Sequence, residues 1–178
     1  MRKIAFVVLM VFALALTASA QTKISGKAHC AKADPESMIE VGDKPGHMMG
    51  ARKAACTYTT PMEIAGAKTT TGEDVATMEM SGSTGRDSGY HTATMDNGDK
   101  FTVHFQGTAK MNKDNTGSFE GKWTFMSGTG KLKGIKGGGT YNGMSAADGS
   151  NDVNVEGDYT IAPPPPPPAK KAPAKKSM

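Results

Sequence analysis

The sequence predicts an all-β protein, a small antiparallel barrel of about eight strands that closes on itself. Short runs of alternating apolar and polar residues recur at the spacing of hairpins. Glycine and threonine are frequent and aromatic residues make up only 6% of the chain, which is typical of strands joined by many turns. No segment carries the apolar stripe of an amphipathic helix. Because each expected strand has one apolar face, a closed barrel would bury that face and leave no open edge, so we favour it over a sandwich.

The expected strands follow one another from residue 55 to residue 161. They cover residues 55–60, 62–70, 75–81, 90–95, 100–111, 118–126, 132–141 and 153–161. Pro61 has no amide hydrogen to donate, so it must lie at an edge or a bend between the first two. Asn97-Gly98 predicts the clearest hairpin turn, because this pair readily adopts positive φ values.

Alternation assigns the faces of the central strands. In residues 100–111, Phe101, Val103 and Phe105 share one face, and His104 lies on the other. Trp123 and Phe125 share a face of the next strand. The glycines spread through residues 128–139 predict bulges, strong coiling, or a close approach by another backbone or a ligand.

Both ends of the chain differ from the body. Met1-Arg2-Lys3, an apolar run over residues 4–16 and the small residues Ala18-Ser19-Ala20 predict a secretory signal peptide, residues 1–20, cleaved after Ala20. The apolar run is too short to span a bilayer, and no other segment predicts a membrane span. We therefore expect a secreted or periplasmic protein.

Residues 163–178, six prolines followed by a lysine-rich stretch, are expected to form a disordered tail. A spacer is the favoured role; contact with anionic lipid or an envelope polymer, or with a proline-recognising domain, are the alternatives. Six of the 21 basic residues lie in the two ends, so residues 21–162 carry 15 basic against 17 acidic residues. Such a body lacks the clustered cations of a nucleic-acid-binding surface.

Residues 21–53 are expected to form an irregular segment that precedes a barrel domain at 54–162. Cys30 and Cys56 bracket most of it and are the only cysteines, so in an oxidising compartment we expect them to pair. The bridge would hold the segment against the start of the first barrel strand. A metal site made by His29, Cys30, His47 and Cys56 is the competing interpretation. Met78 and Met80, on one face of a strand, are thioethers suited to Cu(I), but no ligand spacing predicts a bound metal or cofactor.

Two stretches resemble a known group of proteins. They are GTGKLKGIKGGGTY, which follows Trp123-Thr124-Phe125, and the hairpin MDNGDKFTVHFQGTAK. Both are similar to strands of the allene oxide cyclase barrel-like group, which includes plant dirigent-type proteins, and the resemblance covers roughly Cys56 to Ile161. It implies an eight-stranded barrel with a cavity for a small apolar molecule. It carries over no catalytic residue.

The predicted function is binding of a small apolar ligand in the barrel, without catalysis. The residues expected to line the cavity are Tyr90, His91, Phe101, Phe105 and Trp123. The alternative is an isomerase or cyclase in which Glu63, Glu79 or His91 moves a proton, although alternation favours both glutamates facing solvent. A periplasmic copper-binding protein is a second alternative. The sequence predicts no oligomeric state.

Overall fold

The computed structural model describes residues 21–162. The expected signal peptide and the Pro/Lys-rich tail lie outside the described residues. The elements in chain order are β1 (Thr22–Cys30), β2 (Glu36–Glu40), β3 (His47–Thr60), β4 (Glu63–Ile64), β5 (Ala67–Ser81), β6 (Thr84–Met95), β7 (Lys100–Met111), β8 (Gly117–Gly128), the 3-10 turn η1 (Gly130–Leu132), β9 (Ile135–Ser145) and β10 (Asn151–Ile161). The described residues contain no α-helix.

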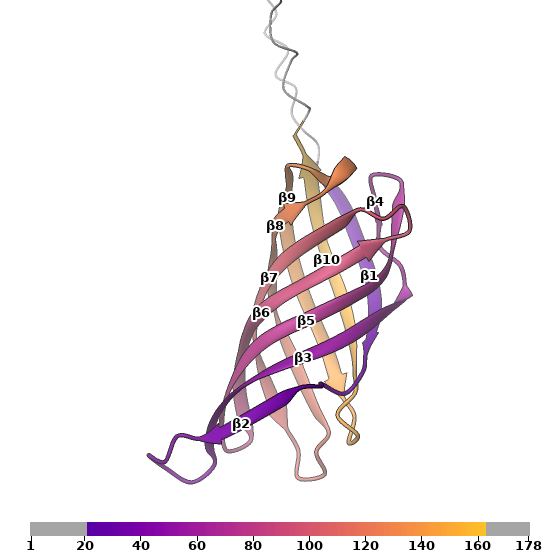
Figure 1. The fold of residues 1–178 in the computed structure, drawn as a ribbon. Helices are drawn as coiled ribbons and strands as arrows, with labels where there is room; N and C mark the ends of the chain where they lie inside the picture. The colour runs from indigo at the N-terminus through magenta and orange to yellow at the C-terminus, as the bar shows by residue number, and fades with distance from the viewer. Residues whose placement is uncertain (1–20, 163–178) are drawn as a thin grey trace, which may run out of the picture.

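Eight of the strands form a closed antiparallel barrel, as the sequence predicts (Figure 1). From β5 to β10 each strand pairs with the next along the chain. The ring then closes because β1 pairs with β10 on one side and with β3 on the other, and β3 pairs with β5. The short strand β2 continues along the edge of β3 that β1 leaves free, and it extends beyond one end of the barrel.

Residues 21–53 do not form the irregular segment that the sequence predicts. β1 is a full barrel strand, and β3 begins at His47 instead of Ala55. The inward residues of β1 are mostly small, Gly26, Ala28 and Cys30, so alternation there produces little hydrophobic contrast. Between β1 and β3, only the connections on either side of β2 lack regular structure.

Other strand boundaries also differ from the prediction, among them β9, which is Ile135–Ser145 instead of 132–141, while the central hairpin is confirmed. In place of the predicted strands 62–70 and 75–81, the structure has a β4–β5 hairpin in which β5 runs without a break. The turn residues of this hairpin, Ala65 and Gly66, have φ of 53° and 78°. β6 begins at Thr84, six residues before the expected start. Pro61 lies in the bend between β3 and β4, and Gly98, with φ of 84°, donates its N–H to Met95 O at 3.0 Å.

Inward glycines make room for large side chains inside a narrow barrel. A Cβ at Gly157 would overlap the Trp123 ring, one at Gly143 the Phe119 ring, and one at Gly121 the Tyr141 ring. Eight strands enclose only enough space for side chains or one small ligand, so each large inward residue needs a small neighbour. Gly121 in β8, Gly143 in β9 and Gly157 in β10 serve this purpose.

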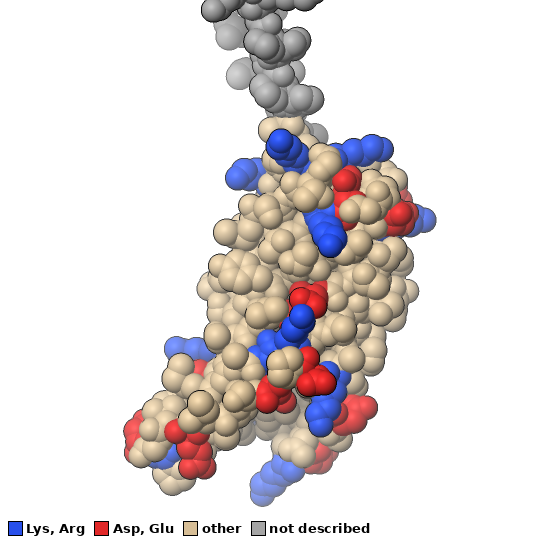
Figure 2. All heavy atoms as spheres, in the orientation of Figure 1, with Lys and Arg blue, Asp and Glu red and all other residues tan. Residues whose placement is uncertain are grey.

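One end of the barrel is filled and the other is open. Buried apolar side chains close the end that holds β4 and η1: Met62, Ile64, Met95, Leu132 and Ile135. The first and last described strands meet at this end, where Thr22 pairs with Tyr159. On the face drawn in Figure 2, positive and negative side chains are interspersed, mainly at the upper rim and over the lower half.

Candidate functional site

A cavity of about 390 Å³ occupies the barrel between the filled end and the loops of the opposite end. Its inner part is lined by aromatic rings, among them Phe101, Phe105, Trp123 and Phe125. Its outer part reaches the connections that follow β1, β7 and β9, at Lys32, Asn115 and Ala147. The volume lies within the range of small-molecule sites.

Four of the five residues predicted to line the cavity do so: His91, Phe101, Phe105 and Trp123. The prediction is wrong for Tyr90, which is 50% exposed on the outer wall and packs edge-on against His104 with ring centroids 5.1 Å apart. Neighbouring residues of a strand point to opposite faces, so Tyr90 and His91 cannot both face inward. His104 lies outside, as predicted.

The aromatic part of the wall is held in place by its own contacts. Phe125 packs edge-to-face with Phe101 and with Trp123, at centroid distances of 5.2 and 5.0 Å. The indole N–H of Trp123 donates to Thr140 O at 3.2 Å. Edge-to-face packing of this kind stabilises aromatic pairs, and with its N–H satisfied Trp123 presents an apolar surface to the cavity.

A chain of hydrogen bonds crosses the wall beside these rings. His91 Nδ1 lies 2.6 Å from Asp74 Oδ1, and His91 Nε2 lies 2.9 Å from the Tyr58 hydroxyl. With Asp74 ionised, His91 donates through Nδ1 and accepts the Tyr58 proton at Nε2. Burial, with a smaller contribution from the Asp74 charge, raises the pKa of Tyr58, so the phenol keeps its proton. The imidazole fits because residue 72 is glycine; a Cβ there would overlap the ring.

A second polar group lies further toward the open end. Arg52 Nη2 is 3.7 Å from Asp87 Oδ2, and the Tyr141 hydroxyl donates to Asp87 Oδ1 at 3.4 Å. Burial raises the pKa of Asp87, although the Arg52 charge acts in the opposite direction. Burial and the nearby Asp87 also raise the pKa of Tyr141. This cluster mixes one guanidinium, one carboxyl and one phenol at the cavity wall.

Sequence reasoning missed Arg52, Tyr58, Asp74 and Asp87. Arg52 and Tyr58 alternate with Ala54 and Cys56 at every second position of β3, so all four share its inward face. Extending the alternation of β3 back beyond Ala55 would have found Arg52. Asp74 and Asp87 interrupt runs of small or polar residues, so their inward orientation follows only from strand pairing.

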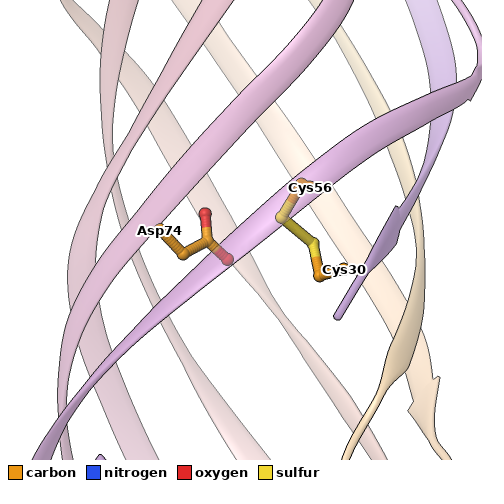
Figure 3. A group of neighbouring side chains, drawn as sticks. All are labelled: Cys30, Cys56 and Asp74. Carbon is orange, nitrogen blue, oxygen red and sulfur yellow. A yellow bond between two sulfur atoms is a disulfide. The ribbon is translucent and has the colours of Figure 1, made fainter. Parts of the chain in front are cut away.

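The predicted disulfide is present, in a different role. Cys30 and Cys56 are direct partners in the β1–β3 register, with Cα atoms 4.0 Å apart and both side chains buried. The bridge therefore joins two adjacent barrel strands instead of tying an irregular segment to the barrel. It faces the interior close to Asp74, whose carboxylate and the two sulfurs lie within 4.8 Å of one another (Figure 3).

The structure does not assemble the metal site proposed from His29, His47 and the two cysteines. His29 faces outward and lies 2.8 Å from Asp152. His47 is at the far end of β3, between Asp43 and Glu79. Among the described residues, only Cys30, Cys56 and Asp74 form a cluster of potential ligands, and both sulfurs are in the disulfide. Met78 and Met80 share one face of β5, as predicted, and this face points inward.

Glu63 and Glu79, the other candidates for proton transfer, face solvent. Glu63 is exposed in the two-residue strand β4. Half of the Glu79 side chain is exposed, and its carboxylate lies 3.0 Å from His47 Nε2. Of the three candidates only His91 reaches the cavity wall.

Fold and site together define a small closed barrel with an internal cavity that is lined by aromatic rings and a few polar groups. No family model and no curated protein matches this sequence. Among solved structures, one similar chain is the conserved protein of unknown function RPA1785 from Rhodopseudomonas palustris. It shares 9% identity at a TM-score of 0.48, over 79% of this chain and 98% of that chain.

Proposed function

We propose that this protein binds one small, largely apolar molecule inside its barrel and does not catalyse its conversion. The observation that carries the proposal is the cavity of about 390 Å³ with a preformed aromatic wall. Concave apolar sites with a few placed polar groups are the usual form of small-molecule sites. The closed eight-stranded barrel also supports the proposed relation to the allene oxide cyclase barrel-like group.

The site supports binding over proton transfer. Glu63 and Glu79 face solvent, and both nitrogens of His91 are engaged by Asp74 and Tyr58. A general base needs a nitrogen or oxygen within reach of the substrate proton, and here the imidazole offers none. An isomerase or cyclase would require this hydrogen-bonded chain to open when substrate enters.

We place the protein outside the cytoplasm. The signal-peptide pattern of residues 1–20 and the Cys30–Cys56 disulfide support this location. In the described part of the chain, no helix is long and apolar enough to cross a membrane.

The fluorescence of Trp123 tests the proposed function. This residue is the only tryptophan of the chain and lines the cavity, so a bound ligand should shift or quench its emission. The panel consists of medium-chain fatty acids and alcohols, monoterpenoids and simple phenolics. If no compound changes the emission at millimolar concentration, the cavity does not bind molecules of these classes and the proposal fails.

A cavity-filling variant gives this test its control. Ala28 lies on the cavity wall in β1, and Ala28→Leu adds three carbon atoms to the interior. We expect at least a tenfold loss of affinity for a ligand found in the panel. Ser25→Leu, at an outward position of the same strand, should leave the affinity unchanged. Circular dichroism checks that both variants fold.

A further inference from the structure

The guanidinium of Arg52 lacks the partners that a buried cation normally has. Its side chain is 17% exposed, and within the described residues its Nε is buried without any hydrogen-bond partner. Burying a charged group without full hydrogen bonding is unfavourable. Arg52 faces the cavity, so a molecule there can reach it.

Asp87 compensates this cation only in part. The closest approach of the two side chains is 3.7 Å, well beyond the length of a strong charge-assisted hydrogen bond. The other Asp87 oxygen is 3.4 Å from the Tyr141 hydroxyl, which is also a weak contact. Burial raises the pKa of Asp87 and so disfavours its charged form, although the Arg52 charge acts in the opposite direction. The guanidinium therefore keeps donors that no group of the described structure satisfies well.

The groups at this place favour an acceptor. Arg52 and the Tyr141 hydroxyl are donors. The other buried carboxylate, Asp74, is already occupied by His91 at 2.6 Å. A planar carboxylate matches the fork of a guanidinium with two parallel hydrogen bonds. An ammonium group would instead meet the Arg52 charge.

The aromatic wall adjoins this cluster. Phe105 packs against Tyr141 with ring centroids 5.9 Å apart, and Trp123 follows next to Phe125. We propose that the ligand of this barrel is an organic acid, with its carboxylate on Arg52 and Tyr141 and its apolar part on the rings of Phe105 and Trp123. This inference deepens the proposed function and depends on it.

Three ligands with the same tail test the inference on the wild-type protein. Octanoate, octanol and octylammonium differ only in the head group, and binding is followed by Trp123 emission and by calorimetry. We expect octanoate to bind at least tenfold more tightly than octanol, and octylammonium more weakly than octanol.

Variants then assign the preference to Arg52. Arg52→Met should abolish the advantage of octanoate over octanol. Asp87→Asn should tighten octanoate binding, because it removes the negative charge that competes for Arg52. Lys53→Met is the control, since Lys53 points outward and pairs with Glu73 at 2.9 Å; it should change none of the affinities.

The outcomes separate the two proposals. If octanol or octylammonium binds as well as octanoate, the carboxylate inference is wrong and the apolar-binding function stands. If Arg52→Met keeps the preference for octanoate, Arg52 is not the anchor. If none of the three ligands binds, the carboxylate inference fails, and the wider panel of compounds decides whether the binding function fails with it. The comparison of head groups needs only the wild-type protein, so it holds even if Arg52→Met does not fold.

Discussion

The hydrogen bonds of His91 show how a single polar side chain is accommodated inside this barrel. The imidazole receives a proton donor on one nitrogen and a proton acceptor on the other, from Tyr58 and Asp74. Buried polar atoms without such partners are costly. His91 therefore fixes the positions of two neighbouring side chains on the cavity wall.

Removal of the Tyr58 hydroxyl tests this arrangement. Tyr58→Phe keeps the ring and leaves His91 Nε2 without its donor, so we expect a loss of about 1–3 kcal/mol in the free energy of unfolding. Urea denaturation measures the change. Tyr90→Phe, on the outer wall, is the matched control and should change stability by less than about 0.5 kcal/mol. Equal stability of wild type and Tyr58→Phe would mean that this bond contributes nothing.

Asp87 should make stability depend on pH. Burial raises its pKa in the folded protein above the ordinary value of 3.8, so the folded state holds this proton more tightly than the unfolded state. Its contribution is therefore favourable below pH 3.8 and is lost as pH rises through the raised folded pKa. Asp87→Asn should lack this dependence.

The measurement is the difference in unfolding free energy between wild type and Asp87→Asn across the acidic range. Taking the difference removes the contributions of other carboxyl groups, such as Asp43 and Asp114, whose pKa values are lowered. A difference that is constant with pH would show that the pKa of Asp87 is not raised.

Among the elements, the junction of β1 and β3 is the shortest seam of the barrel. β1 pairs with β10 through nine residues and with β3 through four, with a register shift after Lys27. The disulfide lies at the last of these four pairs. It closes a loop with a sequence separation of 26, for which chain entropy predicts about 3.5 kcal/mol of stabilisation.

Reduction of the disulfide should open this seam first. Hydrogen exchange with and without reductant should show early loss of protection in residues 56–60, while the β1–β10 ladder stays protected longer. The variant Cys30→Ser/Cys56→Ser should behave like the reduced protein. Simultaneous loss of protection in every strand would show that the bridge stabilises the barrel as a single unit.

The side chain of His47 joins the β2–β3 connection to β5. His47 Nδ1 lies 2.5 Å from Asp43 Oδ1, and Nε2 lies 3.0 Å from Glu79 Oε1. The hydrogen bonds to Asp43 and Glu79 raise the pKa of His47 above 6.5. The stabilisation is present below pH 6.5 and is lost as pH rises through the raised folded pKa.

This contact predicts pH-dependent protection of the connection. Amide exchange in residues 41–46, corrected for the intrinsic pH dependence, should accelerate as pH rises through the folded pKa of His47. His47→Gln should exchange at one rate throughout. His29→Gln is the control, because His29 pairs with Asp152 at a distant place. Identical pH profiles for wild type and His47→Gln would contradict the prediction.

The elements also show what the sequence can and cannot predict. Alternation predicted β7 and the inward faces of Phe101, Phe105 and Trp123, because large apolar residues there contrast with threonine and lysine. It did not predict β1, whose inward side chains are small, or the early part of β3, where Gly50 and Arg52 face inward. The partners of His91 come from two other strands, so only the register brings them together.

At the scale of the whole molecule, the barrel has two unlike ends. Buried aliphatic side chains fill one end, and the described chain begins and finishes there. The cavity reaches the opposite end, where three loops surround it. A ligand can therefore reach the aromatic wall from the end away from both termini of the described part.

The central claim is that the ligand binds inside this barrel, and NMR shift mapping tests it most directly. Spectra of the ¹⁵N-labelled protein are recorded with and without octanoate. We predict shifts concentrated on the inward residues of β3 and of β5 to β9 and on the Trp123 indole N–H, with Tyr90 and His104 on the outer wall unaffected. Shifts confined to the outer wall would contradict the claim. So would the absence of any shift with saturating octanoate and with every compound of the wider panel.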